Sequence, residues 1–278
     1  MNRDPVPARP VALPVFPEFG PRIGLIGDAH GDLDFLLAAV HALHDRGVDS
    51  IAQLGDFGMI WHHDHRDWQR LERLNTELAA LGRHLLVVTG NHENYDAIAA
   101  MPVDADGVRR LGPTWILPRS GRGTAAGRSL GWLSGAASID LNRRGPASWW
   151  AAELPTDEET VAFLTGGPVD IVLAHDALAT RHLAERLART DDLWDPDGRA
   201  YAEYGRTIFT ARVLRVLADG GLVASGHYHA RVSVGEVLTR PNGEPVQARN
   251  EILSSQFNGD SVGVLDTTTL AVQGFAVA

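Results

Sequence analysis

The sequence contains no cysteine, which excludes a disulfide framework and thiolate chemistry. This absence is consistent with a reducing compartment. No apolar run approaches the ~20 residues that a membrane-spanning helix needs. The N-terminal segment also lacks the continuous apolar stretch of a signal peptide. We therefore expect a cytoplasmic protein that has no membrane partner.

Positive charge is scarce as well. The chain carries 25 Lys and Arg residues against 35 Asp and Glu residues, which gives a formal net charge of −10. This balance argues against a broad surface for nucleic acid or for anionic membranes. A local basic pocket is still compatible with it.

The length and composition predict one large α/β domain. A chain of 278 residues that is 44% hydrophobic can bury a substantial core. Residues 1–21 are rich in proline and predict an extended arm. Residues 22–278 contain neither an internal repeat nor a clear linker, so we expect them to form a single domain.

The first third of the chain alternates between strand and helix patterns. The apolar runs Ile23–Ile26, Ser50–Leu54 and His84–Thr89 predict buried strands. Leucines at helical spacing lie between these runs and predict two helices, the first capped by Asp32 and the second closing near Gly82. This alternation predicts parallel strands joined by right-handed crossovers.

The pattern beyond residue 101 is more mixed. A Thr156-x-x-Glu159 capping box predicts the start of a short helix. From 177 to 204 the chain is polar and irregular, and we expect it to cross over the site. The other predicted elements are hairpin strands within 108–117 and 123–134, a buried strand over 169–174, a helix over 207–217, a strand over 222–225 and antiparallel strands from 231 onward.

Acidic, amide and imidazole side chains follow these strands. Because the carboxyl ends of parallel strands meet at one edge of a sheet, we expect the side chains to gather there. A ligand set that mixes histidine nitrogen with carboxylate and amide oxygen suits first-row divalent ions better than it suits a structural zinc site of the Cys type. The candidate metal ligands are Asp28, His30, Asp56, Asn91, His175, His227 and His229. Asp56 is central in this order and could bridge two ions roughly 3.5–4 Å apart.

The ordered motifs resemble those of the calcineurin-like metallophosphoesterase superfamily. The resemblance covers residues 22–278 and rests on Gly27-Asp28-Ala29-His30-Gly31, Gly55-Asp56, Gly90-Asn91-His92-Glu93, His175 and Gly226-His227-Tyr228-His229. It implies an α/β fold, a four-layer αββα sandwich in which helices flank two mixed β-sheets. It also implies one metal held by Asp28, His30, Asp56 and His229, and another held by Asp56, Asn91, His175 and His227.

The resemblance further implies the chemistry. Two divalent transition-metal ions are expected. Mn is the first candidate, and Fe, Zn, Ni and Co are the alternatives. A water that bridges them is acidified enough to act as hydroxide near neutral pH. His92 matches the catalytic histidine of the family and would protonate the leaving oxygen as general acid. Asp56 is also predicted to be a catalytic residue, because it would bind both ions.

The sequence departs from the related Ser/Thr protein phosphatases after Asp56. Their second motif continues to an Asp-Arg pair, whereas Met59 and Ile60 stand here. Arg143 and Arg144 could supply the missing phosphate clamp, or they could be solvated loop residues. We therefore expect hydrolysis of a phosphodiester or a small phosphoester, with a nucleotide or a nucleic-acid end as one candidate substrate. The alternatives are a phosphomonoesterase of the Ser/Thr protein phosphatase type and a non-catalytic metal-binding scaffold.

Two neighbouring features allow more than one interpretation. The cluster Trp61–His65 could contact substrate or simply begin the next helix, and we favour the second with Asp64 as cap. Trp149 and Trp150 could form a stacking wall or anchor a loop in the core. Glu93 is expected to orient a neighbour of the metal ligands, and Tyr228 is expected to pack.

Overall fold

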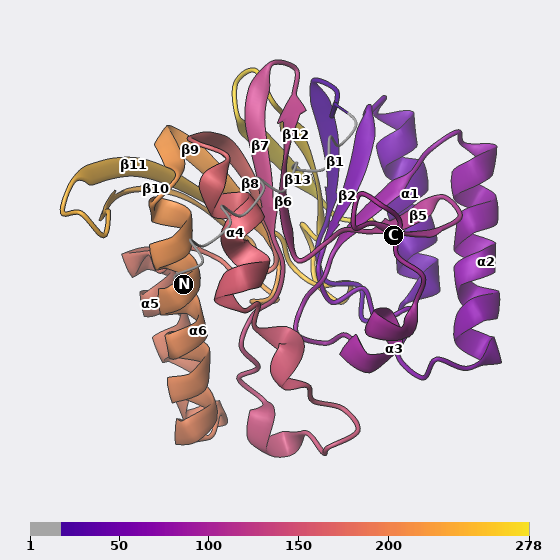
Figure 1. The fold of residues 1–278 in the computed structure, drawn as a ribbon, viewed down its shortest axis with the longest axis horizontal. Helices are drawn as coiled ribbons and strands as arrows, with labels where there is room; N and C mark the ends of the chain where they lie inside the picture. The colour runs from indigo at the N-terminus through magenta and orange to yellow at the C-terminus, as the bar shows by residue number, and fades with distance from the viewer. Residues whose placement is uncertain (1–17, 278) are drawn as a thin grey trace, which may run out of the picture.

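The computed structural model describes residues 18–277, which form two β-sheets packed face to face with helices on both outer sides (Figure 1). The first sheet has the order β13 (Ala271–Phe275), β12 (Val262–Asp266), β1 (Arg22–Ile26), β2 (Ser50–Leu54), β3 (Leu85–Val88), β5 (Thr114–Ile116) and β4 (Arg109–Leu111). The second has the order β10 (Val232–Thr239), β11 (Pro245–Ile252), β9 (Leu217–Ser225), β8 (Val169–Ala174), β7 (Arg128–Leu133) and β6 (Ser120–Ala125). This is the predicted sandwich of two mixed sheets.

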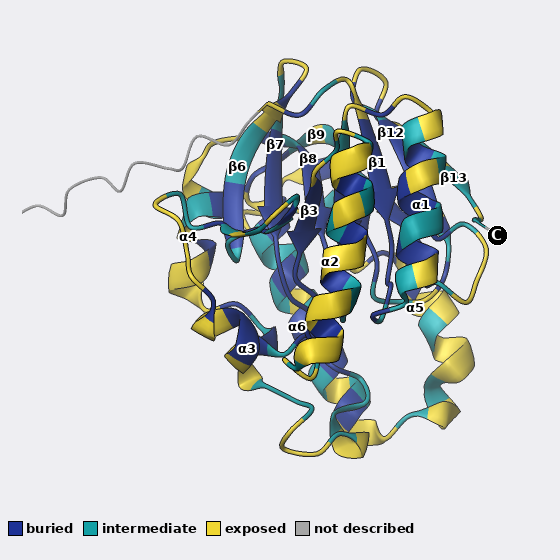
Figure 2. Cartoon of the chain, turned by 90° about the vertical axis from the view of Figure 1, so that its right-hand side faces the viewer, coloured by how far each residue is buried: buried dark blue, intermediate teal, exposed yellow. Residues whose placement is uncertain are grey.

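The first sheet follows the predicted alternation of strands and helices. β1, β2 and β3 pair in parallel, while β12 pairs antiparallel with β1. The helices α1 (Leu33–Asp45), α2 (His65–Ala80) and α3 (Tyr95–Ala100) pack on its outer face. Figure 2 shows that α1 and α2 turn an exposed side outward and keep a buried side against the sheet.

Two predicted helix caps are confirmed. The side chain of Asp32 accepts a hydrogen bond from the main-chain nitrogen of Phe35 at the start of α1. Asp64 accepts from the main-chain nitrogens of Arg66 and Asp67 at the start of α2. A carboxylate at this position satisfies free amide groups of the first turn and complements the helix dipole. The two caps fix where the chain leaves the loops after β1 and β2.

The core between the sheets is apolar. Leu25, Leu54 and Val88 of the first sheet pack in one cluster with Trp132 and Leu173 of the second. The indole of Trp132 lies directly over Gly121, where an added Cβ would come within 2.0 Å of the ring. The apolar alternation of each strand therefore faces the other sheet, as expected for aligned sheet packing.

The second sheet carries α4 (Asp157–Thr165) and α6 (Pro196–Leu214) on its outer face, while α5 (Arg181–Leu187) packs near β10. Both bonds of the Thr156–Glu159 capping box are present at the start of α4, which confirms that prediction. Short 3-10 helices lie at Leu141–Arg143, Ala151–Glu153 and Ala188–Leu193.

The prediction that 177–204 is irregular was wrong, because α5, a 3-10 helix and the first half of α6 occupy most of it. Asp195 caps α6 and Pro196 takes the first helical position. The buried stripe of this helix includes Gly198 and Gly205, whose added Cβ atoms would lie 2.2 Å from the main-chain oxygen of Ile139 and 2.5 Å from the Cβ of Ala137. Close backbone packing replaces large apolar side chains here, so the sequence shows little apolar periodicity.

The C-terminal segment forms the predicted strands. β10 and β11 pair antiparallel around a turn at residues 241–244, where Gly243 has a φ of +88°. β11 also pairs in parallel with β9, which begins at Leu217 rather than at 222. Most of the predicted arm falls outside the described residues. Within its described part, Phe19 is buried and its main chain bonds to Thr124 and Ala126 beside β6.

None of the helices within residues 18–277 combines the length and the apolar character needed to cross a lipid bilayer.

Candidate metal centre

Five loops meet at one end of the two sheets, and each carries a predicted ligand. The loops after β1, β2 and β3 bring Asp28, Asp56 and Asn91 from the first sheet. The loops after β8 and β9 bring His175 and His227 from the second. Parallel strands end at the same edge, so residues far apart in the chain come together here.

The first predicted set of ligands forms a tight cluster. Ligand atoms of Asp28, His30, Asp56 and His229 all lie within 4.8 Å of one another. The Nε2 atoms of His30 and His229 are 2.9 Å apart. The buried Oδ2 of Asp28 lies 3.1 Å from Nε2 of His229 and accepts no well-aligned hydrogen bond within the described part of the chain. Lone pairs that converge in this way suit a cation.

The second predicted set lies against the first. Nε2 of His175 is 2.9 Å from Oδ1 of Asn91 and 3.1 Å from Oδ1 of Asp56. Nδ1 of His175 is 2.7 Å from the main-chain oxygen of Leu54. A carbonyl oxygen can only accept, so Nδ1 carries a proton and Nε2 is the ring atom directed at the site. The ring centroid of His227 is 4.9 Å from that of His175.

Asp56 faces both sets. Its Oδ1 lies beside His175, whereas its Oδ2 lies 3.8 Å from Nδ1 of His30. Oδ1 also accepts a hydrogen bond from the main-chain nitrogen of His92 at 2.8 Å. One buried carboxylate therefore directs its two oxygens to two neighbouring clusters, and it connects them to the loop of His92.

The backbone at these residues is held in an unusual conformation. His30, Asp56, His227 and His229 all have positive φ values, between +44° and +71°. L-amino acids adopt this region at a cost, and such residues concentrate at functional sites. These backbone conformations therefore cost some folding stability, and they direct the four side chains toward the ligand cluster.

The electrostatics of the cluster fit a bound cation. Burial lowers the pKa of His30, and it lowers the pKa of His227 well below the usual value, so both rings keep a free lone pair. Burial also opposes charge on His175, but the carboxylates of Asp56 and Asp28 raise its pKa to about 10. The buried carboxylates thus stabilise a positive charge within the ligand cluster. The nitrogen and oxygen ligands present there are of the kinds that bind first-row divalent ions.

Glu93 connects two ligand loops. Its carboxylate accepts hydrogen bonds from the main-chain nitrogens of Phe57, Gly58 and Gly90. Burial and the charge of Asp56 raise the pKa of Glu93 to about 7. The side chain thus holds the loop after Asp56 against the loop before Asn91.

A buried polar network orients Asn91. Its Nδ2 donates to Oγ of Ser138 at 3.0 Å, which leaves Oδ1 directed toward the site. Ser138 in turn donates to the buried carboxylate of Glu153 and accepts from Arg144. Partners of this kind set the direction of a metal ligand.

His92 lies at the rim of the cluster. Its Nε2 is 3.6 Å from Oδ2 of Asp140, and its ring stacks near Trp61 with centroids 6.4 Å apart. Trp150 meets Trp61 edge-on and donates from Nε1 to Asp96. Asp140 lies directly before the 3-10 helix Leu141–Arg143 and not in the second motif, so a carboxylate from another loop lies beside the imidazole.

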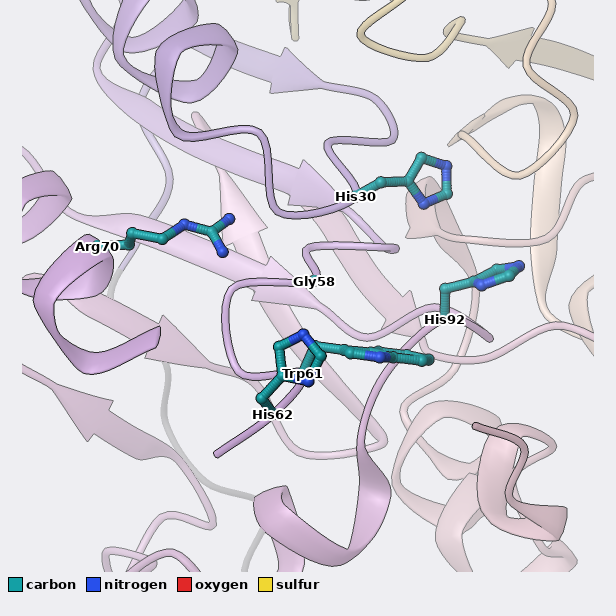
Figure 3. Close-up of a pocket in the computed structure, with 6 residues that line it drawn as sticks. All are labelled: His30, Gly58, Trp61, His62, Arg70 and His92. Carbon is teal, nitrogen blue, oxygen red and sulfur yellow. The ribbon is translucent and has the colours of Figure 1, made fainter. Parts of the chain in front are cut away.

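Two hollows flank His92. A cavity of about 410 Å³ lies over the ligands, and its far wall includes the apolar side chains of Leu193 and Trp194. A smaller pocket of about 240 Å³ lies beside it, and Figure 3 shows its lining residues. His30 and His92 line both hollows, so the smaller pocket is continuous with the wall of the ligand site.

The predicted arginines occupy different positions. Arg144 is only 5% exposed and donates to Ser138 and to the main-chain oxygen of Asn91. Arg143 stacks on Trp194, 4.6 Å from its ring centroid. Sequence reasoning missed Arg206, which lines the ligand cavity, and Arg70, which lines the smaller pocket. Neither follows a strand, so no motif marked them. The role of Arg143 and Arg144 as substrate residues stays a prediction.

A match to a known family agrees with the metal centre described above. A family model described as calcineurin-like phosphoesterase matches residues 21–231. A search of curated sequences finds no significant match. Among solved structures, a dimetal phosphatase from Danio rerio is similar over 87% of this chain and 91% of its own, with 13% identity and a TM-score of 0.43. The family match shows that the chain belongs to the calcineurin-like phosphoesterase family, and this match together with the ligand cluster supports a metal-dependent phosphoesterase.

Proposed function

We propose that the protein is a binuclear metal-dependent phosphoesterase that cleaves a phosphodiester or another small phosphoester. The observation that carries the proposal is the position of Asp56, whose two oxygens face two sets of ligands. The first set is Asp28, His30, Asp56 and His229, and the second is Asp56, Asn91, His175 and His227. Two divalent ions bound there would supply an acidified water and positive charge for the phosphate oxygens.

In this proposal, His92 protonates the leaving oxygen. Its main-chain nitrogen is tied to Asp56, so the ring stays beside the ligands. The carboxylate of Asp140, 3.6 Å from Nε2, lies beside the ring and helps to orient it. Trp61 limits movement of the ring on its other side.

The surroundings of the ligands favour a small organic substituent on the phosphate. The ligand cavity has an apolar wall that includes Ile139, Leu193 and Trp194, which suits an organic leaving group. Met59 and Ile60 are buried in the core beneath the helices, so the Asp-Arg pair of the protein phosphatases has no counterpart there. These features support a diester or small-molecule substrate over a phosphoprotein.

The test is the hydrolysis of bis-p-nitrophenyl phosphate and p-nitrophenyl phosphate by chelator-stripped protein to which Mn²⁺ is returned. We expect metal-dependent cleavage, with the diester cleaved faster. Faster cleavage of the monoester would favour the phosphomonoesterase alternative. Bound metal without cleavage of either compound would favour the non-catalytic scaffold.

A further inference from the structure

The smaller pocket beside His92 carries positive charge from outside the ligand motifs. It is lined by His30, Gly58, Trp61, His62, Arg70 and His92. Among the described residues, none of those that line it is acidic. Figure 3 shows the guanidinium of Arg70 extending from its helix toward Gly58. A hollow with these walls suits an anion.

The hydrogen-bonding capacity of Arg70 is largely unused. A guanidinium has five N–H donors. Within residues 18–277, its contacts are the thioether of Met59 at 3.7 Å and Oδ1 of Asp67 at 3.8 Å. The other oxygen of Asp67 already accepts from the main-chain nitrogens of His62 and His63. Arg70 therefore keeps donors for a ligand.

Two glycines in the loops next to Arg70 leave space for its guanidinium. Gly31 and Gly58 both have positive φ values and lie against each other. A Cβ on Gly31 would come within 2.9 Å of Nη2 of Arg70. The guanidinium thus rests on bare backbone, between the loops that present His30 and Asp56.

The position of this pocket separates its anion from the scissile phosphate. In the proposed function the scissile group lies at the metal ions, and five of the seven predicted ligands line the larger cavity, whereas only His30 lines the smaller pocket. Arg70 does not line that cavity and reaches it only past the shared walls of His30 and His92. An anion on Arg70 would therefore be a neighbour of the reacting group.

We propose that Arg70 binds a second phosphoryl group of the substrate, so that the protein acts on compounds in which the scissile phosphate is linked to another phosphate. This inference rests on the proposed function, because the scissile phosphate fixes where the second one lies. Arginine suits the role, since its planar fork donates two hydrogen bonds to one phosphate.

The test compares the binding of orthophosphate and methylenediphosphonate by calorimetry, with Mn²⁺ in the same excess throughout. The proteins are the wild type, Arg70→Gln, and Arg73→Gln as the control on an exposed position of the same helix. We expect the wild type and Arg73→Gln to bind the diphosphonate about tenfold more tightly than orthophosphate. Arg70→Gln should lose this preference and keep its affinity for orthophosphate within about twofold.

Two outcomes would overturn the inference. Equal weakening of both anions in Arg70→Gln would place Arg70 on the scissile phosphate itself. Unchanged binding of both would show that Arg70 contacts neither. Hydrolysis of bis-p-nitrophenyl phosphate is measured on the same wild-type preparation. Its absence would count against the proposed function, whereas the ratio of affinities tests Arg70 alone.

Discussion

His175 donates its Nδ1 hydrogen to the main-chain oxygen of Leu54, and this bond of 2.7 Å joins the two sheets at the end that carries the ligands. Leu54 ends β2 of the first sheet, and His175 follows β8 of the second. The bond fixes the tautomer of the ring and turns Nε2 toward Asn91 and Asp56. The same bond thus links the packing of the two sheets to the geometry of the metal centre.

The division of roles between Asp56 and His92 is the first prediction. His92→Ala should lower kcat by about 10² or more and leave metal content unchanged, because the ring lies at the rim of the cluster. Asp56→Ala should lose both activity and metal, since its two oxygens face both ligand sets. Metal per chain is measured by mass spectrometry alongside turnover. Equal metal loss in the two variants would contradict this division.

Asp140 should act through His92. Asp140→Asn removes the carboxylate near Nε2 that orients the ring. We expect kcat to fall about tenfold, while KM and metal content stay unchanged. Asp192→Asn, an exposed change in the segment near the cavity, serves as the control. An unchanged kcat in Asp140→Asn would contradict this role of the carboxylate.

Ser138 should control metal affinity without being a ligand. Its hydroxyl accepts from Nδ2 of Asn91 and so directs the amide oxygen toward the site. Ser138→Ala should weaken Mn²⁺ binding by about tenfold. Ser148→Ala changes a hydroxyl in the same loop that bonds to Gly145 instead, and it should bind Mn²⁺ normally. Thermal melting of the stripped proteins separates a fold defect from a change in affinity.

Metal removal should lower thermal stability. A ligand at about 100 times its Kd adds about 2.7 kcal/mol to the free energy of unfolding. For a chain of this size, this corresponds to a rise in Tm of about 5 °C when Mn²⁺ is returned to stripped protein. Asp56→Ala should show little of this rise, because both ligand sets lose their shared carboxylate. An equal rise in wild type and variant would point to metal bound elsewhere.

Local signals explain what could be predicted from the sequence. The cap of α1 by Asp32 and the capping box at Thr156 depend on residues within one turn of a helix. That the candidate ligands lie close together was predictable because they follow strands that end at one edge, whereas their division into two sets was implied by the family resemblance. In both cases a short stretch of sequence already contains the physical cause.

The rest depends on contacts between distant segments. The pairing of His92 with Asp140 joins two loops with no shared motif. The first half of α6 was missed because Gly198 and Gly205 pack it closely, so that few large apolar side chains mark its buried stripe. Arg70 and Arg206 project from helices toward the site, and helical spacing alone does not indicate which exposed arginine faces a cavity.

The most direct test of the central claim is the anomalous scattering from crystals of the Mn²⁺-loaded protein. The two-metal proposal predicts two peaks about 3.5–4 Å apart. Asp56 should lie between them, with His30 and His229 near one peak and Asn91 and His175 near the other. A single peak, or two peaks that do not share Asp56, would contradict the proposal.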